Sequence, residues 1–89
     1  MVPAYCRSRA GGVYRVIRAS EALDASRVRY TLRAVPIFED GHEVVEVTRE
    51  LDSGIFLDKL RHGQAIPTPE RTFEELWQQL RINLDLGCD

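Results

Sequence analysis

In PIFEDGHEVVEVTRE, residues 36–50, an acidic turn precedes alternating apolar and polar residues. Asp40 and Gly41 lie at its centre, and both residue types tolerate the positive φ angles of a two-residue hairpin turn. The pattern therefore predicts two antiparallel strands that reverse at these residues. His42 lies beside the carboxylates of the turn, but acid–base catalysis needs a pocket and a nearby partner. We interpret it as a solvated turn residue.

The strand before the turn, RVRYTLRAVPIF, alternates with a period of two, which is typical of a strand with one buried face. The side predicted to be buried carries Val28, Tyr30, Leu32 and Ala34. The other side carries Arg27, Arg29, Thr31 and Arg33. A two-residue turn predicts the register, with Ile37 opposite Val44, Val35 opposite Glu46 and Arg33 opposite Thr48.

Charge is distributed unevenly along the chain, although the net charge is only −2. Residues 1–33 carry seven arginines, whereas residues 34–58 carry seven acidic residues and a single arginine. The predicted register makes Arg33 and Arg29 diagonal neighbours of Glu46 and Glu50. The basic and acidic segments are therefore expected to neutralise each other within the sheet.

Three other segments flank the hairpin. GGVYRVIRAS, residues 11–20, is rich in β-branched and aromatic residues and predicts a first strand. SEALDAS, residues 20–26, predicts a loop or one turn of helix. Residues 55–60 fit either a third return strand or a helical turn ended by Gly63, and the sequence does not separate the two.

The C-terminal segment predicts an amphipathic helix. Thr72 and Glu75 have the spacing of a capping box, while Thr68 before Pro69 offers a start one turn earlier. The apolar stripe at helical spacing consists of Phe73, Leu76, Trp77, Leu80 and Leu84. Gly87 is the predicted end. Ile82 and Leu86 lie off the stripe, which fits either a second contact surface or a broad core-facing band.

Together these elements predict an α+β fold: a small antiparallel sheet of three to four strands with the C-terminal helix packed on one face. Residues 1–89 are interpreted as a single small domain, with residues 1–10 as a candidate flexible arm and residues 86–89 as a frayed end. Cys6 and Cys88 are predicted to be unlinked thiols. No apolar run has membrane-spanning length, and a cytoplasmic location is predicted.

A search for chemistry finds no nucleotide-binding, metalloprotease, hydrolase or calcium-loop motif, and we predict no metal, no other cofactor and no catalytic residue. Arginines interleaved with tyrosines suggest a nucleic-acid surface, because cationic and stackable groups on a sheet hold single strands. The candidate contacts are Arg7, Arg9, Arg15, Arg18, Arg27 and Arg29. The sequence pI near 5.7 and the neighbouring acidic strand argue against that surface.

The segment YTLRAVPIFEDGHEVVEVTREL, residues 30–51, and residues 72–84 within RTFEELWQQLRINLD together resemble HicB-type antitoxin domains. In those domains a hairpin of the form EDG..VVEV precedes a helix opened by a T.EE. cap. The resemblance implies a small, partly degraded RNase-H-like α+β fold that neutralises an mRNA-cleaving toxin and self-associates. The usual PDLPGC turn is replaced here by TRELDSG, and the connector to the helix is longer, so no functional residue is carried over.

The leading functional prediction is a small non-catalytic protein-binding or regulatory module that binds a protein partner or itself, not a membrane. Its candidate interface residues are Ile82, Leu86, Ile37 and Val44. A nucleic-acid-binding module is the first alternative. A small enzyme or enzyme subunit with a pocket around His62 and Asp58 is the second.

Overall fold

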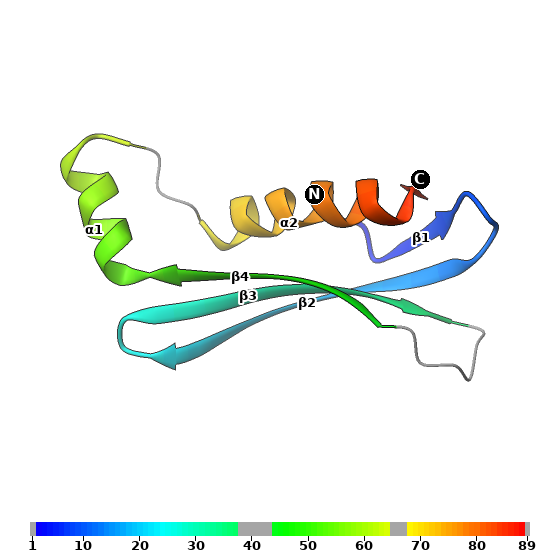
Figure 1. Ribbon diagram of the computed structural model, residues 1–89, viewed down its shortest axis with the longest axis horizontal. Coiled ribbons are helices and arrows are strands. Elements are labelled where there is room, and N and C mark those ends of the chain that lie inside the picture. Colours follow the sequence, from blue (N-terminus) through cyan, green and yellow to red (C-terminus); the bar gives the residue numbers. More distant parts are fainter. Residues whose placement is uncertain (1, 38–43, 65–67, 89) are drawn as a thin grey trace.

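The computed structural model describes residues 2–37, 44–64 and 68–88. Its elements follow the order β1 (Tyr5–Ser8), β2 (Val13–Asp24), β3 (Arg27–Pro36), β4 (Val45–Asp52), α1 (Ser53–Arg61), α2 (Pro69–Leu84) and β5 (Leu86–Gly87). All strand pairs are antiparallel, and the sheet order is β4-β3-β2-β1-β5. Helix α2 lies along one face of the sheet (Figure 1). The α+β class is confirmed, but the sheet has five strands because the chain ends contribute β1 and β5.

Strand β2 extends further than the sequence predicts, through the segment interpreted as a loop or helical turn. It pairs with β3 up to Asp24 opposite Arg27, and only Ala25 and Ser26 remain in the turn. The Asp24 carboxylate closes this turn by accepting hydrogen bonds from the Ser26 backbone N–H at 2.7 Å and its hydroxyl at 2.6 Å. These hydrogen bonds, led by the one from the hydroxyl, hold the pKa of Asp24 below its usual value. Local side-chain bonding therefore stabilises a tight turn where a longer loop was predicted.

The predicted hairpin of β3 and β4 is present, but its register is wrong by two residues. Arg33 lies opposite Glu46, where Thr48 was expected, and Leu32 lies opposite Val47. A shift of two residues moves the pairing along the strand and keeps every side chain on its predicted face. The face that each side chain occupies follows from alternation alone, whereas the register depends on the turn. The residues predicted for that turn, Asp40, Gly41 and His42, lie outside the described residues.

The ambiguity over residues 55–60 is resolved as helix, since α1 spans Ser53–Arg61. The Asp52 carboxylate accepts a hydrogen bond from the Gly54 N–H at 2.6 Å, just where the strand gives way to the helix. At the other end Gly63 adopts a φ of 65°, and the N–H of Gln64 donates to the carbonyl of Lys59. Glycine adopts this left-handed conformation without strain, so it ends α1 as expected.

Helix α2 begins one turn earlier than the favoured capping box predicts. Thr68 is the N-cap, its hydroxyl accepts a hydrogen bond from the Arg71 N–H at 3.3 Å, and Pro69 follows at the start of the helix. Proline favours this first position because its φ is already helical and no N–H is needed there. The helix ends at Asp85, which adopts a left-handed conformation, and the predicted terminator Gly87 lies in β5.

Because α2 begins at Thr68, Thr72 lies inside the helix and not at its cap. Its side chain is fully buried, and its Oγ1 has no hydrogen-bond partner in the described part of the chain. Replacing Thr72→Val is expected to raise the free energy of unfolding by about 1 kcal/mol, because the buried hydroxyl pays a desolvation cost without a bond. Urea titration followed by Trp77 fluorescence measures this change. The control Thr72→Ser keeps the hydroxyl and loses the buried methyl group, so it should be less stable than the wild type; a Val variant no more stable than the wild type would contradict the prediction.

The core lies between α2 and the inner face of the sheet. Phe73, Leu76, Trp77 and Leu80 are buried against Tyr30, Leu32, Ala34, Val47 and Leu51, as the two periodicities predict. The Tyr30 and Phe73 rings meet edge to face, with their centroids 5.7 Å apart. Burial of each large side chain stabilises the fold by about 1.5–3 kcal/mol.

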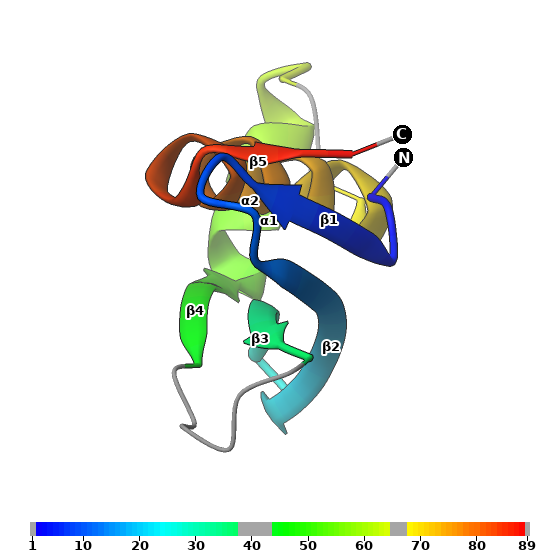
Figure 2. The same ribbon diagram turned by 90° about the vertical axis from the view of Figure 1, so that its right-hand side faces the viewer.

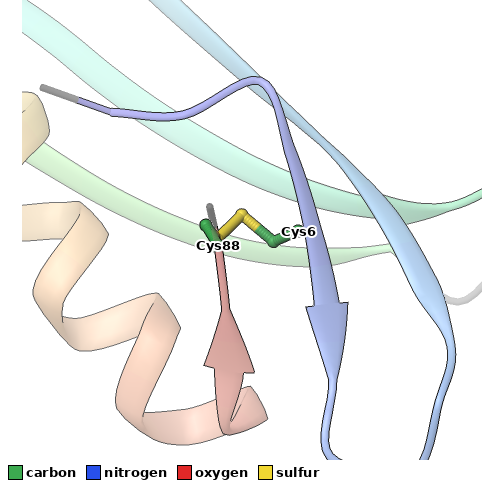
Figure 3. Close-up of a disulfide and its surroundings, with 2 residues drawn as sticks. All are labelled: Cys6 and Cys88. Atoms are coloured by element: carbon green, nitrogen blue, oxygen red, sulfur yellow. A yellow bond between two sulfur atoms is a disulfide. The ribbon is translucent and has the colours of Figure 1, made fainter.

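The two cysteines form a disulfide, so the prediction of unlinked thiols is wrong. Strand β5 pairs with β1, and this brings Cys88 opposite Cys6 with their Cα atoms 4.6 Å apart. Figure 3 shows the two side chains meeting between β1 and the residue that follows β5. Leu86 and Gly87 therefore belong to the sheet and are not frayed. The two cysteines are 82 residues apart in the sequence, so no local pattern indicates that they meet. The pairing of β5 with β1 brings them together.

Candidate interaction surface

The face of the sheet opposite α2, here called the outer face, is not covered by any described element (Figures 1 and 2). Directly opposed residues of antiparallel strands share a face, so the pairing assigns each side chain to one side. On the outer face Tyr5 lies beside Arg15, which lies beside Val35. The inner face carries Tyr14, Val16 and Arg18 of β2 in the same alternation.

One part of the outer face is a set of alternating ion pairs, with the acids in β2 and β4 and the arginines in β3. Arg29 lies 2.9 Å from Glu50 and 3.9 Å from Glu21, and Arg33 contacts Glu46. Arg27 completes the set, 3.6 Å from Asp24 and 3.9 Å from Glu50. These side chains are roughly half exposed, so each pair contributes at most about 1 kcal/mol. Their main effect is to cancel the arginine charge locally.

The other part is apolar and is here called the outer patch. It consists of Tyr5, Val13, Ile17, Val35, Ile37 and Val44. Tyr5 is 61% exposed, Val44 47% and Ile37 41%, while the other three are half-buried. Ile37 continues the sheet beyond β3, because its N–H donates to the Val13 carbonyl at 3.1 Å. Contiguous exposed apolar residues of this kind mark interaction sites more often than scattered ones do.

Tyr5 lines two shallow hollows at the outer patch. One, of about 330 Å³, is lined by Tyr5, Arg15, Val35, Pro36 and Ile37. The other, of about 310 Å³, has Arg7 and Val13 among its lining residues. Within the described part of the chain neither Arg7 nor Arg15 forms an ion pair. The patch therefore combines a tyrosine, aliphatic side chains and two uncompensated guanidinium groups, a composition enriched in protein interfaces.

The structure divides the six arginines predicted to contact nucleic acid among separate places. Arg7 and Arg15 lie on the outer patch, and Arg27 and Arg29 are neutralised in the ion-pair set. Arg9 lies in the turn after β1, 3.7 Å from the carboxylate of Asp85.

Arg18 is three positions from Arg15 in β2, and an odd spacing along a strand places the two side chains on opposite faces. Arg18 therefore lies on the inner face. It donates to both carboxylate oxygens of Glu70 at 3.0 Å, and its guanidinium carbon lies 5.7 Å from the centre of the Phe73 ring. The six arginines therefore do not form one basic surface.

The four predicted interface residues also separate. Ile37 and Val44 lie on the outer patch, and Ile82 is 73% exposed on α2. Leu86 is buried in the core, so its assignment to an interface is wrong. The prediction took Leu86 for a helical residue off the apolar stripe, whereas it lies in β5 with its side chain inward beside Ser8.

The residues proposed for an enzyme site are both exposed at the end of α1. The Nδ1 atom of His62 lies 2.7 Å from the Asp58 backbone carbonyl, so the ring caps the helix end. Within the described ranges no group of three His, Cys, Asp or Glu residues has metal-binding geometry. The helices of the described chain include none with the length and apolar character needed to cross a membrane.

Comparison with known proteins gives no relative: no family model matches the chain, and no curated protein or solved structure matches it either.

Proposed function

We propose that the protein is a small non-catalytic module that binds another protein through the outer face of its sheet. One observation carries this proposal: the described elements cover the sheet on the α2 side only, and the other side carries the outer patch with Arg7 and Arg15 beside it. Exposed tyrosine and arginine beside aliphatic side chains supply the anchors that dominate binding energy in protein interfaces. Self-association and binding of a different protein both fit this surface.

An antitoxin-like role, which the resemblance to HicB-type domains implies, is one form of this proposal. Nucleic-acid binding has less support, because four of the six candidate arginines already lie within 4 Å of a carboxylate. Phosphate binding would have to compete with those carboxylates at each site.

A cytoplasmic location stays a prediction. The disulfide between Cys6 and Cys88 instead favours an oxidising compartment, where such bonds form and persist. Alkylation of the protein in a fresh native-host extract, followed by mass measurement, decides between the two locations. Two alkylated thiols support the cytoplasm, and an unmodified mass supports the oxidising compartment.

Co-purification from the native host tests the proposed function by comparing the wild type with a variant that carries charges in the outer patch. In the double variant Ile37→Asp/Val44→Asp, two carboxylates enter the exposed apolar surface, and the partner recovered with the wild type is expected to be lost. The matched control is Ile55→Asp, which charges an exposed apolar residue on α1. Equal recovery by wild type and double variant would contradict the proposal. A parallel Ile82→Asp variant tests whether the exposed side of α2 contributes.

A further inference from the structure

The edge of the sheet at β4 carries main-chain groups that bond to no described residue. Strand β4 pairs with β3 and is one of the two edge strands of the sheet, β5 being the other (Figure 2). It has eight residues, contains no proline and pairs with β3 in one unbroken register. Long open edges of this kind bind further strands unless they are blocked.

The hydrogen bond from the Ile37 N–H to the Val13 carbonyl fixes which groups point outward. In an antiparallel pair, hydrogen-bonded and non-hydrogen-bonded residue pairs alternate. The odd-numbered residues of β3 therefore bond to β2, and its even-numbered residues bond to β4. Within β4 the residues that bond to β3 are Val45, Val47, Arg49 and Leu51. The N–H and C=O groups of Glu46, Thr48 and Glu50 consequently point to the open edge.

The side chains at this edge define what a bound strand must carry. Across the outer face, one row runs Glu21, Arg29, Glu50, and no described residue takes the next position in the row. The charges alternate in sign, so a cation at that position continues the pattern beside Glu50. The neighbouring row runs Ile17, Arg33, Glu46, so it lacks the acid in β2, but it too ends at the edge with a carboxylate beside which a cation fits. Opposite charges on directly paired strand residues stabilise the pair, and like charges destabilise it.

A second copy of this chain is a poor occupant of the edge. Two β4 strands related by a two-fold axis at Thr48 would place Glu46 opposite Glu50 of the copy. An axis at Arg49 would place Glu46 opposite Asp52 and the two arginines against each other. An axis at Val47 would place the apolar Val44 opposite Glu50 of the copy. Each register pairs like charges or sets an apolar side chain against an acidic one.

We propose that the open edge of β4 binds an extended segment of another protein that carries Lys or Arg at two positions four residues apart. These cations lie beside Glu46 and Glu50, while apolar residues between them pack on the inner side near Val47. Main-chain hydrogen bonds supply affinity in such strand addition, and alternate side chains supply selectivity. This inference rests on the proposed function, because it names the class of protein segment that the module binds.

The test uses two fluorescein-labelled peptides, TKVTVKT and its charge-reversed match TEVTVET. Both sequences read the same in either direction, so their charges face Glu46 and Glu50 in either strand orientation. Anisotropy titration is expected to show binding of the basic peptide and at least about tenfold weaker binding of the acidic one. Amide shift changes in an NMR titration are expected along β4. Equal affinity for both peptides, or no binding of the basic one, would overturn the inference.

Thr48→Pro tests the main-chain contribution separately. Proline removes the Thr48 N–H, which points to the open edge, so the pairing with β3 is retained. The variant is expected to bind the basic peptide at least about tenfold more weakly. The matched control Thr48→Ser keeps the N–H and is expected to bind as the wild type does. If Thr48→Pro fails to fold, Glu46→Gln/Glu50→Gln tests the charges without changing the backbone; undiminished binding in it would contradict the inference.

The two proposals fail in different ways. A native-host partner that is lost in Ile37→Asp/Val44→Asp and kept in Thr48→Pro would overturn the edge inference alone. Selective peptide binding at β4 without any partner that depends on the outer patch would overturn only the assignment of binding to the outer face. A mass that doubles with concentration in the wild type and not in Thr48→Pro would show that a second copy occupies the edge.

Discussion

Reduction of the disulfide between Cys6 and Cys88 is expected to lower the free energy of unfolding by about 4–5 kcal/mol. The bond joins residues 82 apart, so it closes nearly the whole chain into a loop and removes much of the conformational entropy of the unfolded state. Small domains have a total stability of about 5–15 kcal/mol, and this one is near the lower size limit. Reduction should therefore leave the protein close to its unfolding midpoint at 25 °C.

Urea titrations with and without a phosphine reductant, followed by the fluorescence of Trp77, measure the change. The double variant Cys6→Ser/Cys88→Ser should unfold at the midpoint of the reduced wild type, and the reductant should not change it further. Identical midpoints for oxidised and reduced wild type would contradict the closed-loop account. They would also remove the argument for an oxidising compartment.

The second large effect is expected for Leu80→Ala, with a loss of about 2–5 kcal/mol. Leu80 is fully buried where α2 packs on the sheet, so truncation leaves a cavity in the centre of the core. The matched control is Ile82→Ala, two residues further along the same helix and 73% exposed, which should change stability by less than about 0.5 kcal/mol. Equal losses in the two variants would mean that α2 is rotated relative to the sheet.

Local periodicity accounts for the parts of the fold that the sequence predicts well. The burial of Tyr30, Leu32 and Ala34 follows from alternation in one strand, and that of Phe73, Trp77 and Leu80 from helical spacing. Neither pattern depends on what lies elsewhere in the chain. The α+β class and the helix-covered face could be predicted for this reason.

The missed features depend on contacts between distant segments. Pairing of β1 with β5 joins the two chain ends, and no local pattern around Cys6 or Cys88 indicates it. The register of β3 and β4 depends on the turn, so counting from Asp40–Gly41 gave an error of two residues. The start of α2 was mispredicted for a different reason. Thr68 before Pro69 and Thr72 with Glu75 are both sequence signals for a helix N-terminus, and Thr68 is the N-cap.

The candidate site was only partly predictable. Ile37 and Val44 were predicted as interface residues, but Tyr5, Val13, Ile17 and Val35 were not. Residues 13–18 read VYRVIR, so apolar side chains lie on both faces of β2 and no alternation marks Val13 and Ile17 as outer residues. Their face is set by the pairing of β2 with β1 and β3, which also sends Arg15 and Arg18 to opposite faces.

Helix α2 covers one face of the sheet, and no described element covers the other. Hydroxyl-radical footprinting of the dilute protein, read by mass spectrometry at each aromatic residue, measures the exposure of both faces and so tests this arrangement. Fast oxidation is predicted for Tyr5, which is 61% exposed, and slow oxidation for Tyr30 and Trp77, which are 5% and 4% exposed. Oxidation of Trp77 as fast as that of Tyr5, or protection of Tyr5 to the level of Tyr30, would contradict it.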